Sequence, residues 1–196
     1  MSSMLDMIGA AILFGVLILT VARIQGNLNS TMYQNTFNLN TQTAGVLLAR
    51  QIEYDITKAG YRVTGQRIAI ADSTRLSFKG ALTYQGTVDS IAYYPGPTDT
   101  TTMNPNDCRF VRYAKSKGAL SQQLGMTYFR IAYYDSLNNR MNTPVTGASL
   151  AAIRGINVKF RLESLEPVTD PFTGVPGYFA VTWEKLMYPR NLRKPF

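Results

Sequence analysis

The sequence predicts an α+β protein in which one long N-terminal helix packs on a C-terminal antiparallel β-sheet domain. Residues 7–22 form an almost unbroken apolar run, and residues 44–56 repeat apolar side chains every four positions. After residue 60, apolar and polar side chains alternate between turn signals. We therefore expect an apolar helix half at 1–24 that spans a membrane or packs in a bundle of helices, an amphipathic helix half at 25–60 and a β-rich globular domain at 61–196.

The apolar run reads MIGAAILFGVLILTVA, in which only Thr20 is polar. As a helix it spans about 24 Å, and Met4, Leu5 and Ile24 extend it toward the roughly 30 Å of a bilayer core. A helix that is apolar on every face cannot lie on the surface of a small soluble domain. It needs a bilayer or a bundle of similar helices, and its expected contact residues are Ile8, Ile12, Leu13, Phe14, Leu17 and Leu19.

A cleaved secretory signal is not expected in this region. Such a signal has a basic start and a cleavage site with small residues. Here no Lys or Arg precedes Arg23, the N-terminal flank carries Asp6, and no A-x-A-like site follows the apolar run.

The helix is expected to continue, because no proline occurs before Pro95. Residues 27–43 are rich in Asn, Gln and Thr, which are mediocre helix formers, so the helix is expected to loosen there, near Gly26 or Gly45. Gly60 is a natural C-terminal stop, which predicts one helix over about 3–59. Its second half should pack on the sheet domain through Leu48, Ile52 and Ile56.

Eight strands are predicted in the remaining chain, at 67–71, 75–79, 81–85, 90–94, 109–114, 126–134, 155–163 and 178–186. Alternation is clearest where Ile156, Val158, Phe160 and Leu162 share one face. Residues 96–107, 135–144 and 167–177 read as polar loops.

The composition excludes several kinds of site. The chain has no His, which excludes Ser-His-Asp catalysis and His-ligated metals, and its single cysteine, Cys108, excludes an intramolecular disulfide. The carboxylate pairs Glu53 with Asp55 and Glu163 with Glu166 are weak candidates for acid–base chemistry. We expect no enzyme activity, no catalytic residues, no cofactor and no metal site.

Three further groups of residues are expected to have structural roles and not to form binding sites. Asp99, Asn104, Asn106 and Asp107 offer oxygen ligands for calcium, but their spacing fits no EF-hand and a solvated loop is expected. The net charge of +8 comes from basic residues spread along the chain, so no specific nucleic-acid partner is expected. Adjacent aromatic residues at 93–94, 128–129 and 133–134 should divide between the core and the outer face.

The chain resembles the type IV pilin and pseudopilin superfamily, and is most similar to its minor pilin and J-type pseudopilin branch. Besides the N-terminal helix, the resemblance is carried by QIEYDITKAGYR at 51–62, MTYFRIAYYDSLNNR at 126–140 with TPV after it, LAAIRGINVKFRLES at 150–164 and PRNL at 189–192. The order and approximate spacing of these segments hold over nearly the whole chain.

The resemblance implies a structural subunit of an extracellular or periplasmic filament, with helices bundled in the core and β domains outside. The subunit would sit in the inner membrane before assembly, and its partners would be copies of itself or related pilins together with pilus assembly machinery. The Asp6 carboxylate would pair with the N-terminal amine of Met1 in a neighbouring subunit and set the axial register. Alternatively, Ser3 caps the helix and Asp6 completes a capping box.

Two alternatives stay open. In the first alternative, the chain is a minor or tip pilin or a secretion pseudopilin. In the second, it is a single-pass envelope protein whose β domain binds a ligand. A shear-and-pellet assay distinguishes a filament subunit from a membrane-anchored monomer.

Overall fold

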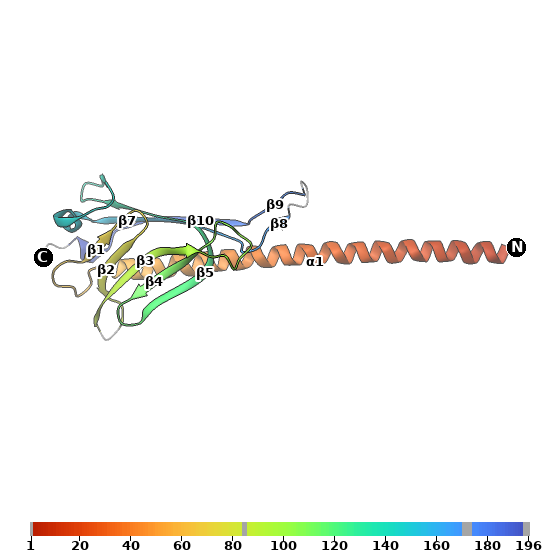
Figure 1. Cartoon of the computed structure of the whole chain (residues 1–196), viewed down its shortest axis with the longest axis horizontal. Coiled ribbons are helices and arrows are strands. Elements are labelled where there is room, and N and C mark those ends of the chain that lie inside the picture. The colour runs from red at the N-terminus through yellow and green to blue at the C-terminus, as the bar shows by residue number, and fades with distance from the viewer. Residues whose placement is uncertain (1, 84–85, 170–173, 194–196) are drawn as a thin grey trace. The chain divides into compact units, whose positions relative to one another are not determined.

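The computed structural model describes residues 2–83, 86–169 and 174–193. The α+β class is confirmed, because a long N-terminal helix packs against a curled antiparallel sheet (Figure 1). The chain divides into two compact units, Met1–Leu39 and Asn40–Phe196, and each is described by itself. The first unit is helical, and the second holds the end of the helix together with the strands.

Helix α1 spans Ser2–Thr57 without interruption. The expected loosening near Gly26 or Gly45 is wrong. Threonine hydroxyls in this region bond back to the helix, since Thr31 donates to the Asn27 carbonyl at 2.9 Å and Thr36 to the Met32 carbonyl at 2.9 Å. These side chains therefore satisfy their hydroxyls within the helix and do not compete with it.

The helix ends two residues before the predicted Ala59. Gly60 adopts a φ of +79°, the left-handed conformation typical of a residue beyond a helix end. Its N–H donates to the Lys79 carbonyl at 2.8 Å, which ties the turn to the sheet. Gly60 is thus the stop that the sequence predicted.

The main sheet is antiparallel throughout the described residues, with the strand order β1-β2-β3-β4-β5-β7-β10 and β6 beside β5. Its strands are β1 (Ile68–Ala71), β2 (Leu76–Ala81), β3 (Val88–Thr98), β4 (Cys108–Ala114), β5 (Gly118–Tyr134), β6 (Arg140–Met141), β7 (Gly155–Glu163) and β10 (Ala180–Met187). A separate ribbon pairs β8 (Val168–Thr169) with β9 (Pro176–Gly177), and 3₁₀ helices cover Gly147–Ala152 and Arg190–Leu192.

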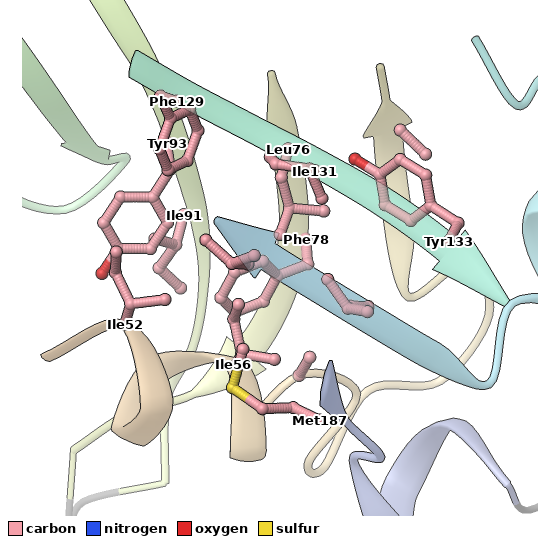
Figure 2. Close-up of a cluster of buried hydrophobic side chains, with 14 of the residues drawn as sticks. Ile52, Ile56, Leu76, Phe78, Ile91, Tyr93, Phe129, Ile131, Tyr133 and Met187 are labelled. Carbon is pink, nitrogen blue, oxygen red and sulfur yellow. The ribbon is translucent and has the colours of Figure 1, made fainter. Parts of the chain in front are cut away.

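The core of the second unit lies between the end of α1 and the inner face of the sheet. Figure 2 shows Ile52 and Ile56 of the helix among side chains from the strands, including Phe78 and Ile91. An aromatic row continues this core, with Phe110 stacked on Tyr93 at a centroid distance of 5.7 Å and edge-on to Phe129 at 5.0 Å. The last turns of α1, from Leu48 to Ile56, are therefore a core element of the domain.

The predicted strand over 81–85 is wrong. The prediction ended one strand at residue 79 and began the next at 81, whereas Gly80 lies within β2, which continues to Ala81. A β-carbon at Gly80 would meet the carbonyl oxygen of Lys58, so glycine serves close approach here and not a turn. Residues 82–83 are not strand, and residues 84–85 lie outside the described part of the chain.

Strand β5 begins at Gly118, eight residues before the predicted start at Met126, because residues 119–124 (ALSQQL) show no alternation of apolar and polar side chains. This first half pairs with β4, and the residues from Met126 onward pair with β7. Between the two halves Gly125 has a φ of +71°, and a β-carbon there would meet the Glu163 carbonyl oxygen. Gly125 thus allows one strand to change partners by bending. Strands β6, β8 and β9 fall in regions predicted as loops.

Candidate functional site

The apolar half of α1 is exposed within this chain. The expected contact residues show 57–72% of their side-chain surface, and they are Ile8, Ile12, Leu13, Phe14, Leu17 and Leu19. The polar Thr20 donates its hydroxyl to the Val16 carbonyl at 2.8 Å. The segment 7–22 is therefore a helix whose outer surface is apolar on every side, with its one hydroxyl satisfied internally.

This helix is long and apolar enough to cross a membrane, judged by length and composition alone. The most apolar stretch of α1 buries none of its residues inside the chain. A large exposed apolar surface indicates contact with another molecule or with lipid. The described chain supplies no cover for this surface.

Asp6 is exposed in the first part of α1, and its apolar neighbours Met4, Leu5, Met7 and Ile8 are exposed as well. Because the helix already includes Ser2, Ser3 lies inside the first turn and not at the N-cap position. The capping-box reading of Ser3 and Asp6 is therefore wrong. Met1, the expected partner through its amine, lies outside the described residues.

In the second unit, the residues predicted for helix–domain packing lie in the core. Leu48, Ile52 and Ile56 expose 0–3% of their surface. A β-carbon at Gly45 would come within 3.2 Å of Val181, so the helix approaches β10 closely at this glycine. Lys185 of β10 and Glu53 of α1 form a partly exposed ion pair at 2.9 Å that also joins the helix to this strand.

A buried ion pair between helix and sheet was not predicted from the sequence. Asp55 accepts a hydrogen bond from the Arg112 Nε at 2.7 Å and another from the Tyr93 hydroxyl. Side-chain exposure is 3% for Asp55 and 16% for Arg112. The spacing of Asp55 could have indicated its burial. It follows Leu48 by seven residues and Ile52 by three, which places it on the apolar face of the helix.

Burial and charge shift the acid–base behaviour of this cluster. Burial first, and then the Asp55 carboxylate, raise the pKa of Tyr93 far above its ordinary value. Burial alone would lower the pKa of Arg112, but the hydrogen bond and charge of Asp55 outweigh it and raise that pKa. Tyr93 therefore stays neutral and Arg112 stays charged, and the cluster fastens the end of α1 to β3 and β4.

The remaining carboxylate candidates do not come together as acid–base pairs. Glu53 and Asp55 point to different partners, Lys185 and the buried Arg112. Glu163 pairs with Arg161 at 2.8 Å and accepts a hydrogen bond from the Asn104 amide at 3.0 Å. Within the described residues, no group of three or more His, Cys, Asp or Glu side chains is placed to hold a metal ion.

The polar loop between β3 and β4 was predicted to be solvated, which is wrong in part, because Asn106 is exposed but three other polar side chains of the loop are buried. Asp99, Asn104 and Asp107 expose at most 4% of their surface. The loop folds on itself, since Asp99 accepts hydrogen bonds from Thr101 at 2.5 and 3.0 Å and from Arg109 at 2.9 Å. Hydrogen bonds within the loop and to the end of β7 replace water around Asp99 and Asn104. The buried carboxylate oxygens of Asp107 have no hydrogen-bond partner among the described residues.

Cys108 and the paired aromatics take structural positions. The Cys108 thiol donates to the Met126 carbonyl at 3.0 Å, and burial raises its pKa, which makes it a poor nucleophile. Tyr93, Phe129 and Tyr133 are buried, whereas Tyr128 is 42% exposed, as strand alternation predicts.

Comparisons of the chain with models of known protein families, with curated proteins and with solved structures find no significant match.

Proposed function

We propose that this protein is a structural subunit of a type IV pilus-like filament. Its apolar helix halves would bundle with those of neighbouring subunits, while the sheet domains form the outer surface. The observation that carries the proposal is the apolar surface of residues 7–22, which no described part of the chain covers. The resemblance to pilins, seen in the segments at 51–62, 126–140 and 150–164, points to the same assembly.

The energy of this surface favours burial by other molecules. Covering one large apolar side chain stabilises a structure by about 1.5–3 kcal/mol relative to water. The exposed residues from Met4 to Ile24 include more than ten such side chains. A free water-soluble subunit is therefore strongly disfavoured, and two environments relieve the cost: a bilayer before assembly and a bundle of helices afterwards.

Transfer from lipid to a helix bundle gains little hydrophobic energy, because both surroundings are apolar. The subunit would therefore need pilus assembly machinery to leave the inner membrane. It would then reside in a filament at the cell surface or in the periplasm. Minor or tip subunits and secretion pseudopilins would use the same helix surface, and filament abundance in cells that lack the protein distinguishes them from a repeating subunit.

Asp6 supplies specificity in this proposal. A carboxylate in an apolar bundle costs several kcal/mol unless it is paired. The N-terminal amine of a neighbouring subunit is the partner that the resemblance implies. Such a pair would penalise every stacking in which the two charges do not meet, and would therefore set the axial register.

The experiment compares the wild type with Asp6→Ala and the charge-retaining control Asp6→Glu. Cells are sheared, the released material is pelleted, and fibres are counted by negative-stain electron microscopy. We expect abundant fibres containing the wild type, a loss of fibres for Asp6→Ala and at least partial recovery for Asp6→Glu. Normal fibres from Asp6→Ala would refute the register role.

A single-pass membrane anchor is the second candidate, favoured by the length and composition of α1. In that case all three proteins would stay in the membrane fraction and no fibrous material would contain the chain. This result would overturn the filament proposal as a whole.

A further inference from the structure

A cavity of about 510 Å³ lies beside the end of α1, next to the turn that joins β4 and β5. All of its lining residues belong to the unit 40–196. Three cationic side chains line it, Arg112, Lys115 and Lys117. Their convergence on one concavity is not explained by filament assembly, because none of them belongs to the apolar helix half.

Arg112 is held rigidly at this cavity. Its Nε donates to the Asp55 carboxylate at 2.7 Å and lies 3.2 Å from the Tyr93 hydroxyl oxygen. Among the described residues, neither terminal amino group of Arg112 has a hydrogen-bond partner. A guanidinium whose Nε is fixed presents these terminal groups as a preformed donor pair, which is the geometry that carboxylate, sulfate and phosphate groups match.

The β4–β5 turn is fixed in a similar way. The Asp89 carboxylate accepts hydrogen bonds from the Ser116 hydroxyl and from the Ser116 N–H at 3.2 Å. The Lys115 N–H donates to the Ser90 carbonyl at 2.9 Å, and the Lys117 N–H to the Ala114 carbonyl at 3.0 Å. Both lysines are exposed, and within the part of the chain that the structure describes neither ammonium group forms an ion pair.

The charges around the cavity favour an anion. Three cations line the cavity with two carboxylates. Asp55 pairs with Arg112, and Asp89 keeps its negative charge while its oxygens accept hydrogen bonds from Ser116 and from the Ser90 N–H at 2.8 Å. The two lysine charges are left without an acidic partner in the described residues. The ring of Tyr54, whose hydroxyl is anchored on the Leu82 carbonyl at 3.0 Å, supplies a flat wall beside them.

We infer that this cavity binds a small oxyanion, a carboxylate, sulfate or phosphate group carried by a sugar or a similarly compact molecule. Arg112 would form the bidentate contact, and Lys115 and Lys117 would close over the anion from the turn. The inference holds whether or not the chain polymerises, because its residues lie outside the proposed assembly surface.

The test is a titration of the full-length, isotope-labelled chain in lipid nanodiscs, followed through its backbone amide resonances. The probes are inorganic phosphate, glucuronate and, as the uncharged counterpart, glucose. The variant is Lys115→Ala with Lys117→Ala. The matched control is Arg130→Ala with Arg140→Ala, which removes the same charge from exposed positions on β5 and β6 away from the cavity.

We expect saturable shifts at residues 114–118 with phosphate, glucuronate or both, and none with glucose. The lysine variant should weaken this binding by at least about fivefold, and the arginine control by less than about twofold. Binding of phosphate alone identifies a free or ester phosphate as the ligand group, and preference for glucuronate identifies an acidic sugar. Absence of saturable shifts with either anion, or equal losses in the two variants, would overturn the inference.

Discussion

Removal of the Asp55 carboxylate tests how the helix is fastened to the sheet. In Asp55→Ala the guanidinium of Arg112 loses its counter-charge, and the Tyr93 hydroxyl loses its acceptor. Breaking a buried ion pair from one side typically costs about 3–5 kcal/mol. Arg112 keeps 16% of its side chain exposed and lines an open cavity, so access to water relieves part of the cost. We therefore expect a loss of about 2–4 kcal/mol in the free energy of unfolding.

The chain provides its own control two residues earlier on the same helix. Glu53 pairs with Lys185 at the surface, with exposures of 34% and 49%, so Glu53→Ala should cost less than about 1 kcal/mol. A double variant, Asp55→Leu with Arg112→Leu, removes both charges and should recover much of the loss.

The assay is thermal unfolding of the full-length chain in one fixed detergent, followed by the fluorescence of Trp183. Trp183 is the single tryptophan and stacks on the core residue Phe160 at 5.2 Å. For a chain of this size, the expected loss lowers Tm by roughly 5–15 °C. If Asp55→Ala destabilises no more than Glu53→Ala, the buried pair does not fasten the helix and the reasoning is refuted.

Three further positions have definite expectations. Gly125→Ala should destabilise more than Gly118→Ala in urea unfolding, because both glycines have positive φ but only the β-carbon at 125 would meet a carbonyl oxygen; equal losses would contradict this. Burial, then Asp55, raise the pKa of Tyr93, so the folded state keeps a proton that the unfolded state releases above about pH 10. Tyr93 should therefore make the unfolding free energy fall there by about 1.4 kcal/mol per pH unit. Burial raises the pKa of Tyr133 as well, so Tyr93→Phe should make the total slope shallower by that amount without abolishing it. Burial raises the pKa of Asp107, so the folded state is penalised near pH 7, where the carboxyl is ionised in the unfolded chain. The change in unfolding free energy caused by Asp107→Asn should therefore be more favourable near pH 7 than near pH 3, where the carboxyl is protonated in both states. An equal change at the two pH values would contradict this.

The features that sequence alone predicted are those set by local pattern. The apolar run and the four-residue repeat through Leu48, Ile52 and Ile56 define one helix with two different surfaces. The alternation through β7 predicts which face of the strand is buried, because the side chains on that face are all apolar. These patterns act within a few residues and need no knowledge of distant contacts.

The features that sequence missed depend on contacts between distant segments. The predicted strands 75–79 and 81–85 leave out Gly80, which lies inside β2 where the Lys58 carbonyl approaches it, and the start of β5, which lacks alternation, forms a strand because β4 supplies partners. Spacing from Leu48 and Ile52 places Asp55 on the apolar face of the helix, but it does not identify the partner, Arg112, which lies 57 residues later in the chain.

The account depends most on where the apolar half of α1 resides. The direct measurement is a helical reconstruction by electron cryomicroscopy of fibres sheared from cells that produce the full-length chain. We predict fibres in which residues 7–22 of each subunit, including Phe14 and Leu19, are enclosed by the same helices of neighbouring subunits. A full-length chain that is recovered only as a monomer, with this segment in lipid or against its own strands, would contradict the account.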